Sequence, residues 1–83
     1  MTIVELFEAI NQNRITGREA MRAIRSLQSV ANDPRARERL GFAFSWAKIY
    51  FNPRGAAKYG GPANVKQYLL ADLILAQQFM PSP

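Results

Sequence analysis

Three arginines in the first half of the chain have the spacing of one helix face. Arg18, Arg22 and Arg25 are four and three residues apart, so on an α-helix they form a single row. The planar guanidinium group donates hydrogen bonds in pairs to phosphate oxygens, which suits such a row to a polyanion. A row that only keeps the helix surface solvated is an equally good interpretation of the same pattern.

Basic charge continues beyond this row. The chain has 11 Lys and Arg residues against 6 Asp and Glu residues, a formal net charge of +5. A glycine-containing stretch at residues 52–62 adds two cations and a tyrosine, which could hold a nucleotide-like ligand by charge and stacking. The natural partner of this set is a polyanion or an acidic protein surface. Polyanion or partner binding is therefore predicted for Arg18, Arg22, Arg25, Arg35, Arg37, Arg39, Arg54, Lys58 and Tyr59.

The residues of most enzyme active sites are missing from this sequence. The chain contains no histidine and no cysteine, which removes the commonest general base, the best nucleophile and two types of metal ligand. Glu5 and Glu8 share a helix face, but that face is opposite the apolar stripe of the same segment. We therefore expect a protein that is not an enzyme, with no catalytic residue, no cofactor and no metal site.

Helices must position the basic residues, because no segment alternates between apolar and polar residues as a strand does. A threonine followed three residues later by glutamate, the capping-box pattern, occurs at Thr2 and again at Thr16. Asp33 precedes a proline at the first position of a further helix. The sequence predicts an all-α fold, a single four-helix domain over residues 1–83 with an irregular basic loop at 52–62. The expected helices cover residues 3–11, 17–31, 34–51 and 63–80.

The four expected helices differ in how much apolar surface they carry. The segment 17–31 is amphipathic, with Ala20, Ile24 and Leu27 on one face and the arginine row on the other. Residues 40–51, in contrast, hold five aromatic side chains, and residues 68–76 read YLLADLILA. An 83-residue chain has few elements with which to cover two such segments. We expect a homo-oligomer whose interface contains Phe42, Trp46, Ile49, Tyr50, Leu70 and Ile74.

Asp72 does not fit the apolar pattern of the last segment. Its helical angle places it between Val65, Ala76 and Phe79, where an unpaired carboxylate would be costly. We expect it to form an ion pair with an Arg or Lys of the same chain. The alternative is a polar contact across a subunit interface.

Two functions remain open from the sequence. The first is a small non-enzymatic protein that binds a polyanion, with nucleic acid as the first choice, through its arginine-rich face. The alternative is an adaptor or inhibitor, of the mobile-element or regulatory type, that docks on an acidic or nucleic-acid-binding surface of a larger protein. The acidic N-terminus and the absence of cysteine and of a long apolar run lead us to expect a cytoplasmic protein without a membrane partner.

Overall fold

All regular structure in the described chain is helical, which confirms the all-α class. The computed structural model describes residues 1–81 and, at Pro53, the backbone alone. No helix in this part of the chain is both long and apolar enough to pass through a bilayer. In chain order the elements are α1 (Ile3–Asn11), α2 (Gly17–Val30), α3 (Pro34–Tyr50), α4 (Pro53–Ala56), the 3₁₀-helix η1 (Ala57–Tyr59) and α5 (Pro62–Gln77).

The predicted starts of the first three helices are confirmed by their hydrogen bonds. The Thr2 hydroxyl accepts from the backbone N–H of Glu5 at 3.1 Å, and Thr16 caps α2 in the same way at 3.2 Å. The Asp33 carboxylate accepts from the N–H of Arg35 at 2.9 Å, so it caps α3. Each contact satisfies an N–H group that has no partner inside its helix. These helix starts follow from local chemistry alone.

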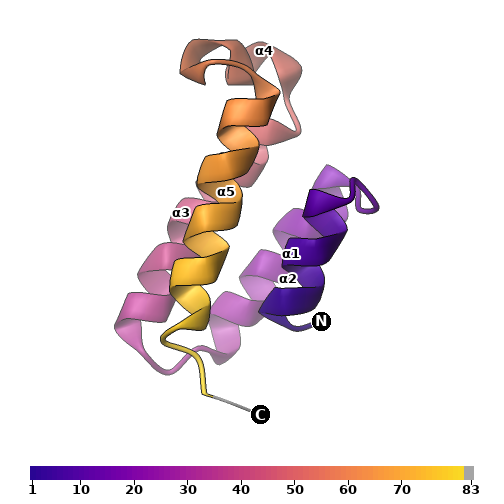
Figure 1. The fold of residues 1–83 in the computed structure, drawn as a ribbon. Helices are drawn as coiled ribbons and strands as arrows, with labels where there is room; N and C mark the ends of the chain where they lie inside the picture. Colours follow the sequence, from indigo (N-terminus) through magenta and orange to yellow (C-terminus); the bar gives the residue numbers. More distant parts are fainter. Residues whose placement is uncertain (82–83) are drawn as a thin grey trace.

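The helices form two layers, with α1 and α5 in front of α2 and α3 (Figure 1). The chain descends along α2, returns along α3 and descends again along α5, so consecutive long helices are antiparallel. α3 packs against α2 within its own layer and against α5 in the other layer. α1 packs against α5 beside it and against α2 behind it. α3 is therefore the helix shared by the two largest packing surfaces, and its outer side separates the edges of α2 and α5.

The core is built from small side chains on α3 and larger ones on its neighbours. Three alanines and one leucine form the buried face of α3. Small residues let helix axes approach closely, so α2 and α5 can pack on two sides of α3 at once. Buried core residues are Ile3, Leu6, Ile10, Ala20, Ile24, Leu27, Ala31, Ala36, Leu40, Ala43, Ala47, Leu69, Leu73 and Ala76.

The segment 52–62 differs from the irregular loop expected there. It contains the short helix α4 and the turn η1, which are added to the four long helices that were predicted. Proline at the first position favours a helix start, and the backbone angle φ is +91° at Gly60 and +98° at Gly61. Those two glycines end η1, because other residues resist positive φ. The ordered turn holds its side chains in defined places.

Candidate polyanion interface

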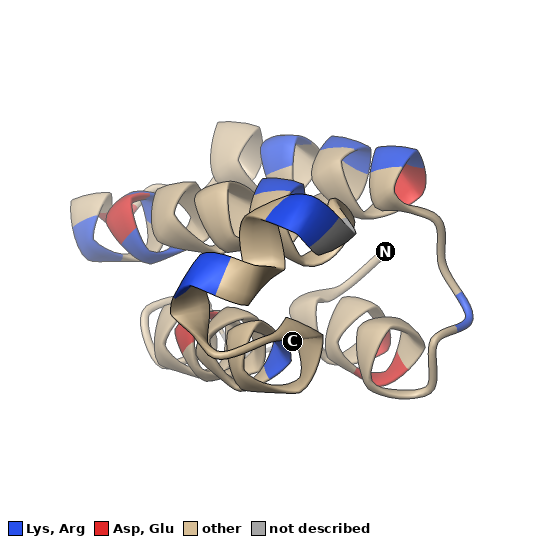
Figure 2. Ribbon diagram, turned by 90° about the horizontal axis from the view of Figure 1, so that it is seen from above, with Lys and Arg blue, Asp and Glu red and all other residues tan. Residues whose placement is uncertain are grey.

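The arginine row of α2 lies on the outer surface of the molecule. Arg18, Arg22 and Arg25 are all exposed, as their spacing predicts. Figure 2 shows a series of blue bands along α2 with a red band at one end, while α1 carries red bands only. The opposite face of α2 buries Ala20 and Ile24 in the core. The exposed side of α2 is therefore mainly basic, with Glu19 in its first turn.

Arg25 connects the row to α3. Its guanidinium carbon lies 3.7 Å from the ring centroid of Phe44, and its Nη1 donates to the side-chain oxygen of Gln28 at 2.7 Å. Gln28 in turn donates to the backbone oxygen of Arg37 on α3 at 3.1 Å. An aromatic face and a neutral amide orient this guanidinium without cancelling its charge. Arg25 is thus held in place and remains cationic at the surface.

α3 adds two further cations beside the row. Arg37 is exposed, and its Nε donates to the backbone oxygen of Ala31 at 2.7 Å. Lys48 follows Phe44 by four residues, which places it on the same edge of α3, toward α2. Lys48 was not among the predicted binding residues. The spacing of Lys48 from Phe44 puts both residues on one side of α3, but the sequence does not show that this side faces α2. We call this set the basic face: Arg18, Arg22, Arg25, Arg37 and Lys48.

Arg35 is occupied within the chain. Its Nη2 lies 2.8 Å from the Asp33 carboxylate, and its guanidinium carbon lies 4.3 Å from the ring centroid of Phe79. The hydrogen bond from Arg35 lowers the pKa of Asp33, and the same contact raises the pKa of Arg35. Arg35 therefore contacts Asp33 at the start of α3 and Phe79 after α5, and it does not belong to the basic face.

Arg39 provides the intramolecular partner expected for Asp72. Its Nη1 lies 3.5 Å from Asp72 Oδ1, which confirms the ion pair. Asp72 is only 8% exposed, and burial raises its pKa, although Arg39 and then Trp46 act in the opposite direction. Within the described residues, ion pairs involve only Arg35 and Arg39 among the cations. No ion pair joins the basic face to a carboxylate there, although the charge of Arg22 contributes to the lowered pKa of Glu19.

The other predicted binding residues lie elsewhere in the fold. Arg54 is on α4, and Lys58 and Tyr59 are on η1, which packs against α4 and α5. All three side chains are exposed. The rings of Tyr59 and Trp46 are nearly perpendicular, with their centroids 5.3 Å apart. These residues therefore form a surface at the α4 end of the α3–α5 pair.

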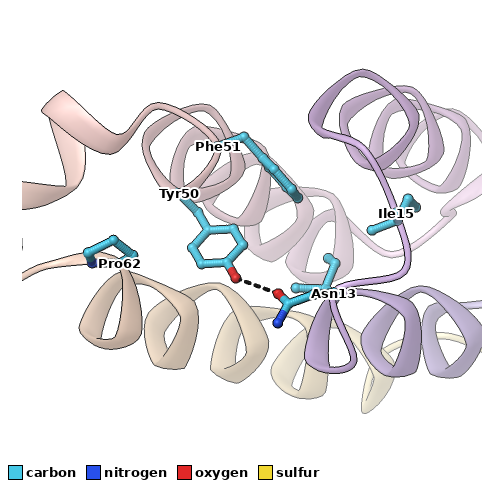
Figure 3. A pocket seen from close by; sticks show the side chains of 6 residues that line it. Asn13, Ile15, Tyr50, Phe51 and Pro62 are labelled. Carbon is cyan, nitrogen blue, oxygen red and sulfur yellow. Dashed lines mark hydrogen bonds between the residues drawn. The ribbon is translucent and has the colours of Figure 1, made fainter.

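Tyr50, one of the predicted interface residues, holds two parts of the chain together. Its hydroxyl donates to Asn13 Oδ1 at 2.8 Å, across a pocket between the α1–α2 linker and the ends of α3 and α5 (Figure 3). Lys66 of α5 donates to the backbone oxygen of Asn11 at 2.8 Å beside it. Tyr50 thus has an intramolecular role that its spacing did not reveal.

The remaining predicted interface residues are divided among three places. Phe42 and Trp46 lie on the α5 side of α3, and Ile49 lies against α4, where Gly55 approaches its Cγ2. Ile74 lines a groove with α1, and Leu70 precedes it by one turn on the same face. The fold does not bring these side chains into one surface.

No protein-family model matches this sequence, and comparisons with curated proteins and with solved structures find no match.

The acidic side chains beside α1 serve the starts of α1 and α2. A hollow beside α1 is lined by Glu5, Glu8 and Glu19 together with Arg14. The side-chain hydrogen bond from Thr16 lowers the pKa of Glu19, and the backbone hydrogen bond from Thr2 lowers that of Glu5. Both carboxylates are thus engaged in helix caps. Within residues 1–81, no group of three or more acidic side chains has the arrangement needed to hold a metal ion.

Proposed function

We propose that this protein is a non-enzymatic polyanion-binding protein whose ligand is nucleic acid. The observation that carries the proposal is the basic face, in which cations of α2 and α3 lie side by side and none forms an ion pair among the described residues. Arg25 and Arg37 are held by neutral acceptors, so their charge remains available at low conformational cost. Phosphate groups are the ligands that such guanidinium groups bind most effectively.

The dimensions of the row are compatible with a nucleic-acid backbone. Arg18 and Arg25 are seven residues apart on a helix that rises about 1.5 Å per residue, so the row is about 10 Å long. This length covers about three steps of one strand. Backbone contacts of this kind give affinity without reading the base sequence. We therefore expect binding that depends strongly on salt and weakly on sequence.

The test is fluorescence anisotropy with labelled single-stranded and duplex DNA across a salt series. If all five cations contact phosphates, log K should fall with log salt with a slope of about −3.5 on single strands and about −4.5 on duplex. Arg22→Gln should reduce that slope by about 0.7–0.9. Arg14→Gln is the matched control, because it removes the same charge from the hollow lined by carboxylates. No binding at about 50 mM salt would exclude the proposal.

The alternative is an adaptor that uses the same cations to bind an acidic protein surface. Trp, Tyr and Arg dominate the energetics of protein interfaces, and all three are exposed or half-buried here. Binding measurements on the purified protein distinguish the two functions. Salt-dependent binding to oligonucleotides whose salt slope falls in Arg22→Gln and is unchanged in Arg14→Gln favours nucleic acid.

The second part of the proposal is self-association. Val4 and Ile74 are 52% and 51% exposed and line a groove between α1 and α5 with Ile3 and Phe7. We infer that a second copy covers this groove, since the same patch can pair with itself about a two-fold axis. Of the six residues predicted for the interface, this proposal keeps only Leu70 and Ile74, on the side of α5 that faces the groove.

A further inference from the structure

Three aromatic side chains from three elements meet on the side of α3 away from the basic face, and a fourth lies one helical turn away. Trp46 is at the centre, with its ring centroid 4.9 Å from that of Tyr68 on α5 and 5.3 Å from that of Tyr59 on η1. Phe42 precedes Trp46 by one turn of α3, so it extends the group along that helix. We call these residues the aromatic patch: Phe42, Trp46, Tyr59 and Tyr68.

The rings of the aromatic patch are open to solvent. Phe42 is 45% exposed, and Tyr59 and Tyr68 are each 43% exposed, while Trp46 is half-buried beneath them. Phe42, Tyr59 and Tyr68 lie outside the core and the side chains packed directly on it. A contiguous group of exposed rings on a small protein is typical of a recognition surface.

Hydrogen bonds hold the patch in one arrangement before any ligand arrives. Asn64 Nδ2 donates to the backbone oxygen of Tyr59 at 2.6 Å and lies 3.4 Å from the hydroxyl of Tyr68. Gly60, with φ of +91°, turns the chain so that Tyr59 faces Trp46. A rigid pair of rings loses little conformational entropy when a flat ligand stacks on it.

Cations border the same rings. The guanidinium carbon of Arg39 lies 5.8 Å from the ring centroid of Phe42, and Lys58 directly precedes Tyr59 on the exposed turn. Two carboxylates are near: Asp72 is paired with Arg39, and Glu38 lies one turn before Phe42. Flat apolar faces with flanking cations match the two parts of a nucleotide, the base and the phosphate.

We propose that the aromatic patch stacks the unpaired bases of a single-stranded nucleic acid whose phosphates contact the basic face. This inference rests on the proposed function and narrows its ligand class. Bases in a duplex are stacked on one another, whereas those of a single strand can lie on exposed rings. The patch and the basic face flank the outer side of one helix, about 10–12 Å across. A bound strand of about 4–16 nucleotides is enough for one small domain to contact both surfaces.

Trp46 makes the inference directly measurable, because it is the single tryptophan of the chain. We would titrate the protein with a single-stranded oligonucleotide and follow tryptophan emission and anisotropy together. An abasic strand of equal length keeps the phosphates and removes the bases, and a duplex keeps both but hides the base faces. We expect quenching of Trp46 by the ordinary single strand and little quenching by the other two.

Paired variants separate the rings from the general fold. Tyr59→Leu/Tyr68→Leu keeps apolar side chains and removes the flat faces, and it should weaken single-strand binding by about tenfold or more. Tyr59→Phe/Tyr68→Phe keeps the faces and should bind like the parent. Phe79→Leu, beside Arg35 just after the end of α5, is the control for a ring removed elsewhere. Circular dichroism establishes that each variant keeps its helices.

The outcomes distinguish this inference from the function on which it rests. Absence of binding to every nucleic acid removes both. Equal affinity for ordinary, abasic and duplex ligands, without quenching, overturns the stacking inference and leaves polyanion binding intact. Emission of Trp46 that changes with protein concentration alone, and no longer does so in the leucine variant, would assign the patch to a contact between copies and also overturn the inference.

Discussion

The Asp72 carboxylate shows how one residue can oppose the stability of its own fold. Burial removes water from it, and Arg39, 3.5 Å away and itself partly exposed, compensates incompletely. Its pKa is therefore raised above the ordinary value of 3.8. When a carboxyl group has a higher pKa in the folded state, stability is greatest below the unfolded-state pKa. It falls as the pH rises through the interval between the two values.

The Asp72→Asn variant should therefore gain stability relative to the parent protein as the pH rises. We expect the variant to be at least as stable as the parent near pH 7. Near about pH 3, where Asp72 is protonated, the parent should regain stability relative to the variant. Glu5, Glu19 and Asp33 act in the opposite direction, because their pKa values are lowered by hydrogen bonds. Comparing melting temperatures of the two proteins at each pH cancels those contributions. If the variant instead loses stability relative to the parent as the pH rises, the attraction of Arg39 for the Asp72 carboxylate exceeds the cost of its burial.

Gly60 determines where Tyr59 is placed. Its φ of +91° is strained for any other residue, and an added Cβ would lie 2.7 Å from Asn64 Nδ2. Gly60→Ala should displace Asn64, release the Tyr59 carbonyl and change the emission of Trp46, with a loss of about 1–2 kcal/mol in the free energy of unfolding. Gly61→Ala is the matched control, because its φ is also positive but nothing lies within 4 Å of its Cβ. Equal changes in emission for both variants would contradict the role given to Asn64.

At the scale of elements, the α2–α3 pair depends on a close approach at its open end. A Cβ at Gly17, the first residue of α2, would lie 2.8 Å from Phe51 Cβ. Real Cβ atoms do not approach so closely, so a larger residue must push the helix ends apart. Because the basic face spans both helices, the same approach also sets the distance between its cations.

Gly17→Ala should lower the free energy of unfolding by about 1–3 kcal/mol, the usual effect of overpacking. Gly41→Ala, on the same pair of helices, is the control, since its Cβ meets only the side-chain amide of Gln28 at 3.4 Å. Denaturant unfolding of both variants gives the comparison. A Gly17→Ala protein as stable as Gly41→Ala would show that the end of α3 yields easily.

At the scale of the whole molecule, charge and apolar surface are distributed over different sides. The basic face is on α2 and the adjoining edge of α3, and the α1–α5 groove carries Val4 and Ile74. A chain measuring 35 × 22 × 16 Å cannot enclose every apolar side chain of its two longest helices. Binding to a polyanion and association between copies can therefore use separate surfaces.

Self-association through the groove predicts a specific variant. Ile74→Gln places an amide in the contact and should shift the molecular mass measured by light scattering from dimer to monomer. Tyr68→Gln alters another exposed residue, on the other side of α5, and should leave the mass unchanged. A parent protein that is monomeric at every concentration measured would remove the inferred contact.

Much of this fold is contained in short-range sequence patterns. The capping threonines, Asp33 before Pro34 and the apolar stripe of α2 depend on residues within a few positions of each other, so their structure could be predicted locally. The arginine row of α2 belongs to the same class, because helix periodicity alone places it opposite the core.

What the sequence by itself determined is therefore the four long helices, the starts of the first three, and the exposure of the arginines on α2. Tertiary structure alone decided which cations share a surface. Arg39 is taken by Asp72, 33 residues away, Lys48 joins the basic face through the packing of α2, and Tyr59 meets Trp46 because Gly60 turns the chain. Such partners depend on the packing of distant segments, and no local periodicity records the distance between them.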